Sequence, residues 1–283
     1  MKDSIKVKCP AKINLTLEIV NRRDDGFHNI KSIMHFVNLY DYLSIKISSN
    51  NKKEIILDGN SNEIPYDERN LVYKAVDLYF KTINSDKYRV EVYIEKNIPI
   101  SAGLAGGSTD AAGALWGINQ LLNKLDDEQL HRICSQLGSD LNVCLNGGCS
   151  LATSRGEVTK KIASLDYPVT LIKPKYLGIS AGEAYKKYAL KPIKYQNDMT
   201  EKMLDAIEKK SDIKEFLYND LEYAVFDDYS ELQEIKLAYP NSIMTGSGST
   251  YFALENLKSS KLDENFLFIN NLRLIKSGIE EII

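Results

Sequence analysis

The chain has 283 residues, enough for two domains of ordinary size that each bury a hydrophobic core. Its formal net charge of −3 gives no overall basic field, so nucleic acid is not expected as a partner. No apolar run approaches the length that crosses a membrane, and the N-terminal residues lack the apolar segment of a secretion signal. We therefore expect a cytoplasmic protein without a membrane partner.

Cysteine and histidine are sparse and scattered. The four cysteines have no CxxC or zinc-type spacing, so reduced thiols in the core are expected rather than a disulfide framework. The three histidines are too far apart in the chain to indicate a metal cluster.

The first half of the chain is rich in strand patterns with helical patterns inserted. Apolar and polar residues alternate, as in half-buried strands, at residues 5–9, 13–19, 43–47, 54–57, 89–95 and 150–153. Helical spacing is found at residues 70–79, 111–122 and 126–137, the last followed by Gly138 as a helix stop.

After about residue 160 helical patterns dominate. They occur at residues 182–188, 200–209 and 229–239 and are interrupted by strand patterns at 169–172, 242–245 and 251–254. Strands and helices mix without a regular β-α-β alternation, so an α+β fold is expected rather than a doubly wound sheet. We expect two domains, residues 1–160 and 161–283.

A glycine-rich run at residues 98–112 separates a strand pattern from a helical one. Gly103, Gly106 and Gly107 allow the backbone to approach a ligand closely, and a helix start offers unpaired N–H groups. Ser108 to Asp110 are expected at the cap and in the first turn of that helix. The run predicts an anion site, most simply for phosphate, although a plain turn before a helix is the alternative. It is neither a Walker A loop nor a GxGxxG fingerprint.

Three further motifs carry residues suited to chemistry. In Pro10-Ala-Lys-Ile-Asn14, Lys12 and Asn14 share one strand face, which is either a functional face or a polar outer surface. Asp24-Asp-Gly-Phe-His28 indicates a turn followed by an aromatic residue, and the aromatic residue is either buried or has a binding role. Asp140 follows Gly138-Ser, where a helix cap is the common alternative to a catalytic carboxylate.

Taken together, these motifs resemble those of the GHMP kinases, an ATP-dependent family of small-molecule kinases. The run from Pro99 resembles the second family motif and Met244–Ala253 the third, with Ser249 in place of the usual proline. The opening PAKIN and the DGFH segment resemble one branch, whose substrate carries a cytidyl group and belongs to non-mevalonate isoprenoid synthesis. Phe27 stands where that branch usually has tyrosine, and Asn142 where many relatives have proline.

The resemblance implies a two-domain fold: an N-terminal domain like a ribosomal small-subunit protein, a ferredoxin-like C-terminal domain, and the active site in the cleft between them. It implies phosphorylation of an alcohol on the cytidyl substrate by ATP with Mg²⁺, with Lys12 and Asp140 catalytic and Ser108 contacting the metal. Substrate-binding roles are implied for Asn14, Phe27, His28 and Tyr185. The implied ATP-binding residues are Pro99, Ile100, Ser101, Ala102, Gly103, Leu104, Ala105, Gly106, Gly107, Ser108 and Thr109.

Two alternatives remain open at this point. One is a GHMP kinase for another small molecule, of the homoserine or phosphomevalonate type, which has no reason to carry DGFH. The other is a catalytically silent nucleotide-binding regulator on the same fold, which would be expected to lose Lys12 or Asp140. The expected assembly is a monomer or a weak homodimer.

Overall fold

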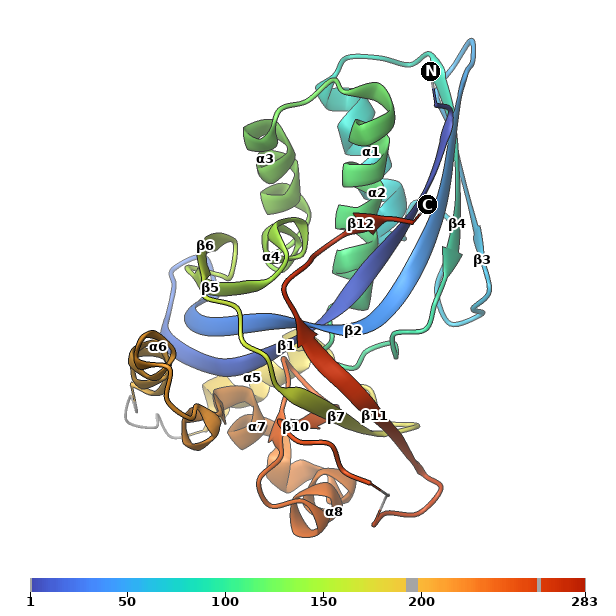
Figure 1. Cartoon of the computed structure of the whole chain (residues 1–283). Coiled ribbons are helices and arrows are strands. Elements are labelled where there is room, and N and C mark those ends of the chain that lie inside the picture. The colour runs from blue at the N-terminus through green and yellow to red at the C-terminus, as the bar shows by residue number, and fades with distance from the viewer. Residues whose placement is uncertain (1, 192–197, 259–260, 283) are drawn as a thin grey trace.

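Two long antiparallel strands form the centre of the sheet. The computed structural model describes residues 2–191, 198–258 and 261–282. Strands β1 (Ser4–Arg22) and β2 (His28–Ser49) pair along nearly their full length, from Ser4 opposite Lys46 to Arg22 opposite His28. They connect the upper and lower halves of the molecule in Figure 1.

Helices lie in two groups, one in each half. In the upper half are α1 (Leu71–Thr82), α2 (Gly106–Leu122), α3 (Asp127–Leu137) and α4 (Leu141–Asn146). In the lower half are α5 (Ala181–Leu190), α6 (Met199–Lys209), α7 (Asp220–Val225) and α8 (Ser230–Ala238).

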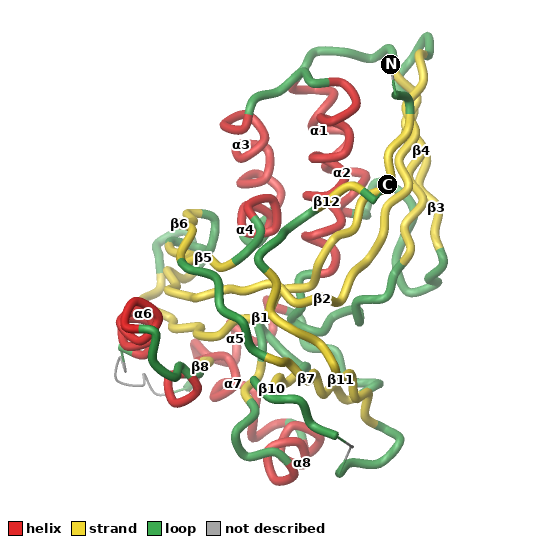
Figure 2. The backbone as a smooth tube through the Cα atoms, viewed as in Figure 1, coloured by secondary structure: helices red, strands yellow, loops and turns green. Residues whose placement is uncertain are grey.

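The strands form one connected path, as Figure 2 shows. Its order is β12-β1-β2-β11-β7-β10-β9, with β4 and β5 also pairing with β2, β3 with β4, β6 with β5, and β8 with β1. The bounds of these strands are β3 Glu54–Gly59, β4 Tyr88–Glu95, β5 Cys149–Thr153, β6 Val158–Ile162, β7 Pro168–Pro174, β8 Tyr218–Asn219, β9 Ile243–Met244, β10 Tyr251–Ala253, β11 Phe266–Ile275 and β12 Glu280–Glu281.

The fold is α+β, as the sequence predicts. Strand β11 pairs with both β2 and β7, and β12 returns from the end of the chain to lie against β1. The two halves are therefore joined by backbone hydrogen bonds as well as by the chain itself. A domain boundary at residue 160 stays a prediction.

Helix α2 is the element that brings the glycine-rich run to the site. A Cβ on Gly113 would lie 2.3 Å from Cys9 Sγ on β1, so only glycine permits this close packing of the helix on the sheet.

The expected cap at Ser108 is wrong. The helix begins at Gly106, and its N-cap is Ala105 in the left-handed conformation (φ 57°), without a side-chain capping bond.

Helix α3 begins as its sequence predicts. Asp126 and Gln129 form a capping box, in which each side chain accepts the other's backbone N–H. The four cysteines are free and buried, as expected.

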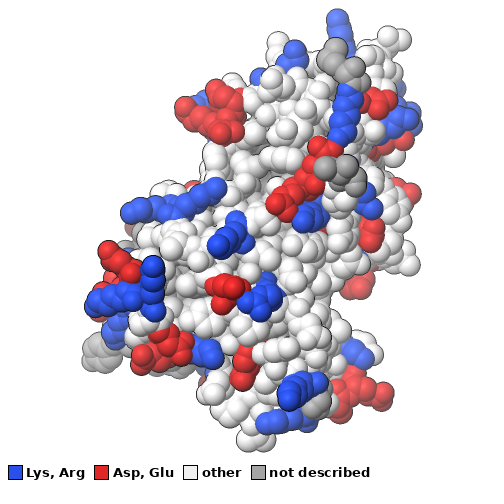
Figure 3. Space-filling model, viewed as in Figure 1, with Lys and Arg blue, Asp and Glu red and all other residues white. Residues whose placement is uncertain are grey.

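In the part of the chain that is described, neither a large patch of one charge on the face that Figure 3 draws nor a membrane-spanning helix is seen. On the face drawn in Figure 3, basic and acidic side chains are interspersed rather than gathered by sign. Within the described residues, no helix combines the length and the apolar character that a membrane span needs.

Candidate active site

A cavity of about 840 Å³ lies between the N-terminal part of α2, the β1–β2 hairpin and helix α5. This volume is in the range of small-molecule sites. Contacts divide many of its lining residues into two groups. The group around the Lys12–Asp140 ion pair contains Lys12, Asn14, Gly103, Ala105, Ser108 and Asp140, and the group around the His28–Tyr185 and Arg155–Phe27 ring contacts contains Arg22, Phe27, His28, Arg155, Tyr185 and Lys186. We call the first group the reacting end of the cavity and the second group, which carries the aromatic rings, the base end.

Lys12 is buried at the reacting end, with only 3% of its surface exposed. Asn14 and Thr16 on the same face of β1 are buried as well, which rules out a polar outer surface for this face. The ammonium of Lys12 donates to Asn14 Oδ1 (2.6 Å) and to the carbonyl of Gly103 (3.2 Å). It lies 3.5 Å from Asp140 Oδ2. The cation is thus held in one place, between the glycine-rich run and the carboxylate.

Asp140 occupies the N-cap position of α4, but its side chain makes no capping hydrogen bond. Instead it faces Lys12 across the cavity wall and keeps 31% of its side-chain surface exposed. An ionised carboxylate in this position can accept a proton from a ligand hydroxyl. The simple helix-cap reading of this motif is therefore wrong.

The glycine-rich run at residues 98–112 packs directly on the segment Met244–Ala253. Gly103 has φ 71°, and a Cβ there would lie 2.1 Å from the carbonyl oxygen of Thr245. The hydroxyl of Thr245 donates to Gly103 O at 3.4 Å and accepts from the backbone N–H of Asn14 at 2.9 Å. The segment around Thr245 therefore fixes both the glycine-rich run and the strand that carries Lys12.

The Asn219-Asp-Leu-Glu222 segment forms hydrogen bonds to the backbone of Met244–Gly246. Asn219 Nδ2 donates to the carbonyls of Met244 (2.6 Å) and Gly246 (2.9 Å). Glu222 Oε2 accepts from the backbone N–H of Met244 at 3.0 Å. Both residues are buried, so their role at the site is structural.

Of the eleven residues expected to bind ATP, three line the cavity and eight do not. Gly103, Ala105 and Ser108 line the cavity, at the end of α2 where backbone N–H groups lack helical partners. In contrast, the side chains of Ala102, Leu104 and Thr109 are buried. Of these three, only the backbone can reach a phosphate.

The described part of the chain shows no metal site built from several acidic, cysteine or histidine side chains. No group of three or more His, Cys, Asp or Glu side chains suited to a metal ion occurs in the described ranges. Mg²⁺ usually keeps several waters and binds through one or two protein groups plus the phosphates of its nucleotide. The Ser108 hydroxyl lies on the cavity wall and could serve as one such protein ligand.

The base end carries the aromatic residues that the sequence singled out. His28 stacks on Tyr185 of α5, with ring centroids 5.3 Å apart and planes inclined by 14°. Burial, and then the charge of Arg22, lower the pKa of His28. Burial, and then the negative charge of Asp140, raise the pKa of the Tyr185 hydroxyl. Phe27 is 54% exposed on the turn between β1 and β2.

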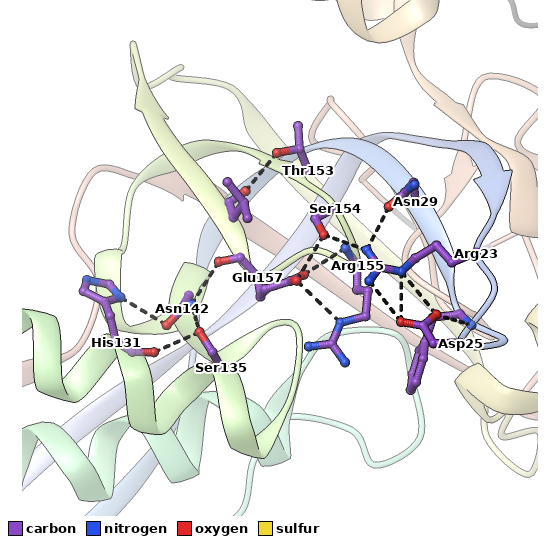
Figure 4. Close-up of polar contacts among 12 residues, drawn as sticks. Arg23, Asp25, Asn29, His131, Ser135, Asn142, Thr153, Ser154, Arg155 and Glu157 are labelled. Atoms are coloured by element: carbon purple, nitrogen blue, oxygen red, sulfur yellow. Dashed lines mark hydrogen bonds and ion pairs between the residues drawn. The ribbon is translucent and has the colours of Figure 1, made fainter.

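A polar network runs from helix α3 to this turn, as Figure 4 shows. Asn142, two residues after Asp140, donates to Ser135 Oγ (2.8 Å) and to the carbonyl of Glu157 (2.9 Å). Farther along, Arg23 donates to Ser154 Oγ at 3.3 Å and pairs with Asp25. The 154–157 turn is thus fastened both to the helix that follows Asp140 and to the turn that carries Phe27.

Sequence reasoning missed three cationic residues at the base end: Arg22, Arg155 and Lys186. Arg155 lies in the turn between β5 and β6. No local pattern distinguishes these residues from ordinary surface cations, because only the tertiary fold brings them to one cavity.

The fold and this site together define a GHMP kinase. The family described as "GHMP kinases N terminal domain" matches residues 70–150, which include the glycine-rich run and Asp140. The chain is 37% identical to the 4-diphosphocytidyl-2-C-methyl-D-erythritol kinase of Syntrophomonas wolfei, covering 94% of this chain and 95% of the relative. It is 38% identical to the enzyme of that name from Bacillus pumilus, with 89% and 88% covered. The chain belongs to the 4-diphosphocytidyl-2-C-methyl-D-erythritol kinase family.

Solved structures agree in fold. A crystal structure of 4-(cytidine 5'-diphospho)-2C-methyl-D-erythritol kinase is 30% identical, with a TM-score of 0.73 over 88% of this chain and 90% of that one. A homoserine kinase from Cytophaga hutchinsonii has a TM-score of 0.75 at 19% identity, covering 100% and 98%, and thus shares the fold alone.

Proposed function

We propose that this chain transfers the γ-phosphoryl group of ATP to the 2-hydroxyl of 4-diphosphocytidyl-2-C-methyl-D-erythritol, in non-mevalonate isoprenoid synthesis. The observation that carries the proposal is one cavity with the Lys12–Asp140 pair at one end and Phe27, His28 and Tyr185 at the other. The identity to relatives of that name supports the same substrate.

At the reacting end, Asp140 takes the proton of the substrate hydroxyl as its oxygen attacks the γ-phosphorus. Lys12, held by Asn14 and by the carbonyl of Gly103, orients that oxygen and stabilises its growing negative charge. Because Lys12 is held by hydrogen bonds before binding and is paired with Asp140, much of the benefit comes from positioning.

The phosphates of ATP lie at the start of α2, where backbone N–H groups from Gly103 to Thr109 neutralise part of their charge. Ser108 is the residue that would contact a Mg²⁺ ion bound with ATP, and such an ion would supply further charge neutralisation.

At the base end, the cytosine lies on the open face of Phe27. His28 is held neutral by burial, so its ring can form a hydrogen bond to the edge of the base. Tyr185, which contacts His28, is available as a second stacking face. Asn14 lies within the cavity wall close to the acceptor hydroxyl.

The test is ADP formation by the purified protein with ATP, Mg²⁺ and one acceptor at a time. We expect turnover with the cytidyl substrate and none above background with homoserine or phosphomevalonate. Turnover with either of these instead, or with no acceptor at all, would contradict the proposal.

A cytoplasmic location and a monomeric or weakly dimeric state are part of the same proposal. Cell fractionation and light scattering over a range of protein concentrations test them.

A further inference from the structure

The 154–157 turn lies between the two ends of the cavity. A Cβ on Gly156 would lie 3.3 Å from Cβ of Ser139, the neighbour of Asp140. The guanidinium carbon of Arg155 lies 5.1 Å from the centroid of the Phe27 ring. One short turn therefore contacts both the residue beside the reacting carboxylate and the aromatic ring proposed to hold the base.

Within the described residues, Arg155 is held by its backbone N–H and its Nε but not by its two terminal guanidinium nitrogens. Its backbone N–H donates to Glu157 Oε2 at 2.8 Å, and its Nε faces Glu157 Oε1 at 3.5 Å. Among the described residues, its two terminal nitrogens have no hydrogen-bond partner, and Figure 4 draws contacts only to Nε and the backbone. The side chain is 32% exposed and lines the cavity.

The charge of the cavity wall favours an anion at the base end. Lys12, Arg22, Arg155 and Lys186 line the cavity, against Asp140 as the one carboxylate among its described lining residues. Lys12 is already engaged with Asp140, whereas the other three cations surround the base end. Arg22 and Lys186 are exposed, so Arg155 is the cation that is already positioned.

The substrate class of the proposed function has an anion at the matching place. In a cytidine diphosphate ester, the diphosphate joins the base-bearing nucleoside to the alcohol that is phosphorylated. A guanidinium with two free N–H₂ groups can bind phosphate oxygens in a bidentate manner, which a single ammonium cannot.

We propose that Arg155 is a substrate-binding residue that pairs with the diphosphate of the cytidyl substrate while its guanidinium covers one face of Phe27. The ring is thereby left with one open face for the base. This inference rests on the proposed function and deepens it, because it names the group that makes a nucleoside diphosphate, rather than a nucleoside, the ligand.

The test is calorimetric binding of cytidine and of cytidine 5'-diphosphate to the parent protein and to Arg155→Met. Methionine keeps an unbranched side chain against Phe27 but removes the charge. We expect the affinity for the diphosphate to fall roughly tenfold to thirtyfold, with the affinity for cytidine unchanged. Equal losses for both ligands would mean that Arg155 acts only by supporting Phe27, and no loss for either would remove it from the site. Both results overturn the proposal.

Two further variants guard the interpretation. Arg132→Met is the matched control, because Arg132 on α3 also pairs with a glutamate, Glu128, but is 68% exposed and does not line the cavity. It should leave both affinities unchanged. Arg155→Lys should bind the diphosphate more tightly than Arg155→Met but less tightly than the parent, since lysine has the charge but not the two-pronged guanidinium. An affinity no higher than that of Arg155→Met would contradict a charge-based role.

Kinetics separate this inference from the function on which it rests. Arg155→Met should raise KM for the cytidyl substrate while KM for ATP and kcat stay close to the parent values. If the parent protein does not turn over the cytidyl substrate, the proposed function fails. If the parent does and Arg155→Met has the same KM, only the inference fails.

Discussion

The two ends of the cavity are built in different ways. At the reacting end, Lys12 and Asn14 are 3% and 1% exposed, and their partners Gly103 and Thr245 are 91 and 231 residues away in the chain. At the base end, Phe27 is 54% exposed, and its backbone N–H bonds to Asp25, two residues before it.

This difference shows what each end tolerates. A shift at the reacting end disturbs hydrogen bonds from several distant segments at once, so its chemistry leaves little room for change. At the base end a local turn presents the Phe27 ring to the cavity, and phenylalanine offers the same kind of aromatic face for the proposed stacking as the tyrosine that the family resemblance implies. We therefore expect variants at the reacting end to change kcat and variants at the base end to change KM.

The largest effect is expected for Asp140→Asn. The amide has nearly the same shape but cannot accept the proton, so kcat should fall by roughly 10² to 10⁴ with KM little changed. Steady-state kinetics with both substrates measure this. A kcat close to that of the parent would show that no protein base is needed, as in a fully dissociative phosphoryl transfer.

Phe27→Ala tests the base end. Loss of a stacking face for one base should cost on the order of 1–3 kcal/mol, which raises KM for the cytidyl substrate roughly tenfold to a hundredfold. The KM for ATP should hardly move, because we propose that ATP binds at the start of α2. If KM for ATP rose instead, the assignment of the two ends would be reversed.

Two adjacent glycines sharpen the comparison within the reacting end. Gly107 is exposed in the first turn of α2, and a Cβ there meets nothing within 4 Å, so Gly107→Val has room for its side chain. Because we propose that the phosphates lie at this helix start, the variant should raise KM for ATP by about tenfold. A Cβ on Gly106 instead lies 3.1 Å from Lys96 Nζ and 3.2 Å from Ile98 Cγ2, so Gly106→Val should mainly lower the free energy of unfolding, by about 1–3 kcal/mol. Chemical denaturation and ATP kinetics of both variants distinguish the two effects, and the same outcome for both would be inconsistent with the structure.

The smallest expected effect is a dependence of KM on pH at the base end. Burial, and then the charge of Arg22, lower the pKa of His28 below its ordinary 6.5, so the ring is neutral at pH 7. The KM for the cytidyl substrate should stay constant above pH 7 and rise as the pH falls through that lowered pKa, where the ring gains a proton. In His28→Gln this dependence should disappear. A rise that begins above pH 7 in the parent would contradict a lowered pKa.

Local patterns predicted the secondary structure where local chemistry decides it. Helices α1 and α3 lie where helical spacing in the sequence predicts them, and the structure adds an N-cap at Asn70 and a capping box of Asp126 and Gln129. The start of α2 was placed too late because it is set by tertiary contacts: Gly103 packs on Thr245, and the chain enters the helix through a left-handed Ala105. Strand β11 was not predicted, and it is fixed by pairing with the distant β2 and β7.

The site shows the same limit. The family resemblance predicts two catalytic residues and three aromatic substrate-binding residues, and the fold places all five on one cavity: Lys12, Asp140, Phe27, His28 and Tyr185. Arg155 carries no such signal, because its position depends on how the turn around Gly156 packs on Ser139.

The most direct test of a single cavity with two distinct ends is a crystal structure with the cytidyl substrate and a non-hydrolysable ATP analogue. We predict that the base lies on Phe27, that the 2-hydroxyl is within hydrogen-bond distance of Asp140, and that the phosphates lie at the start of α2. A base bound away from Phe27, or an acceptor hydroxyl out of reach of Asp140, would contradict the account.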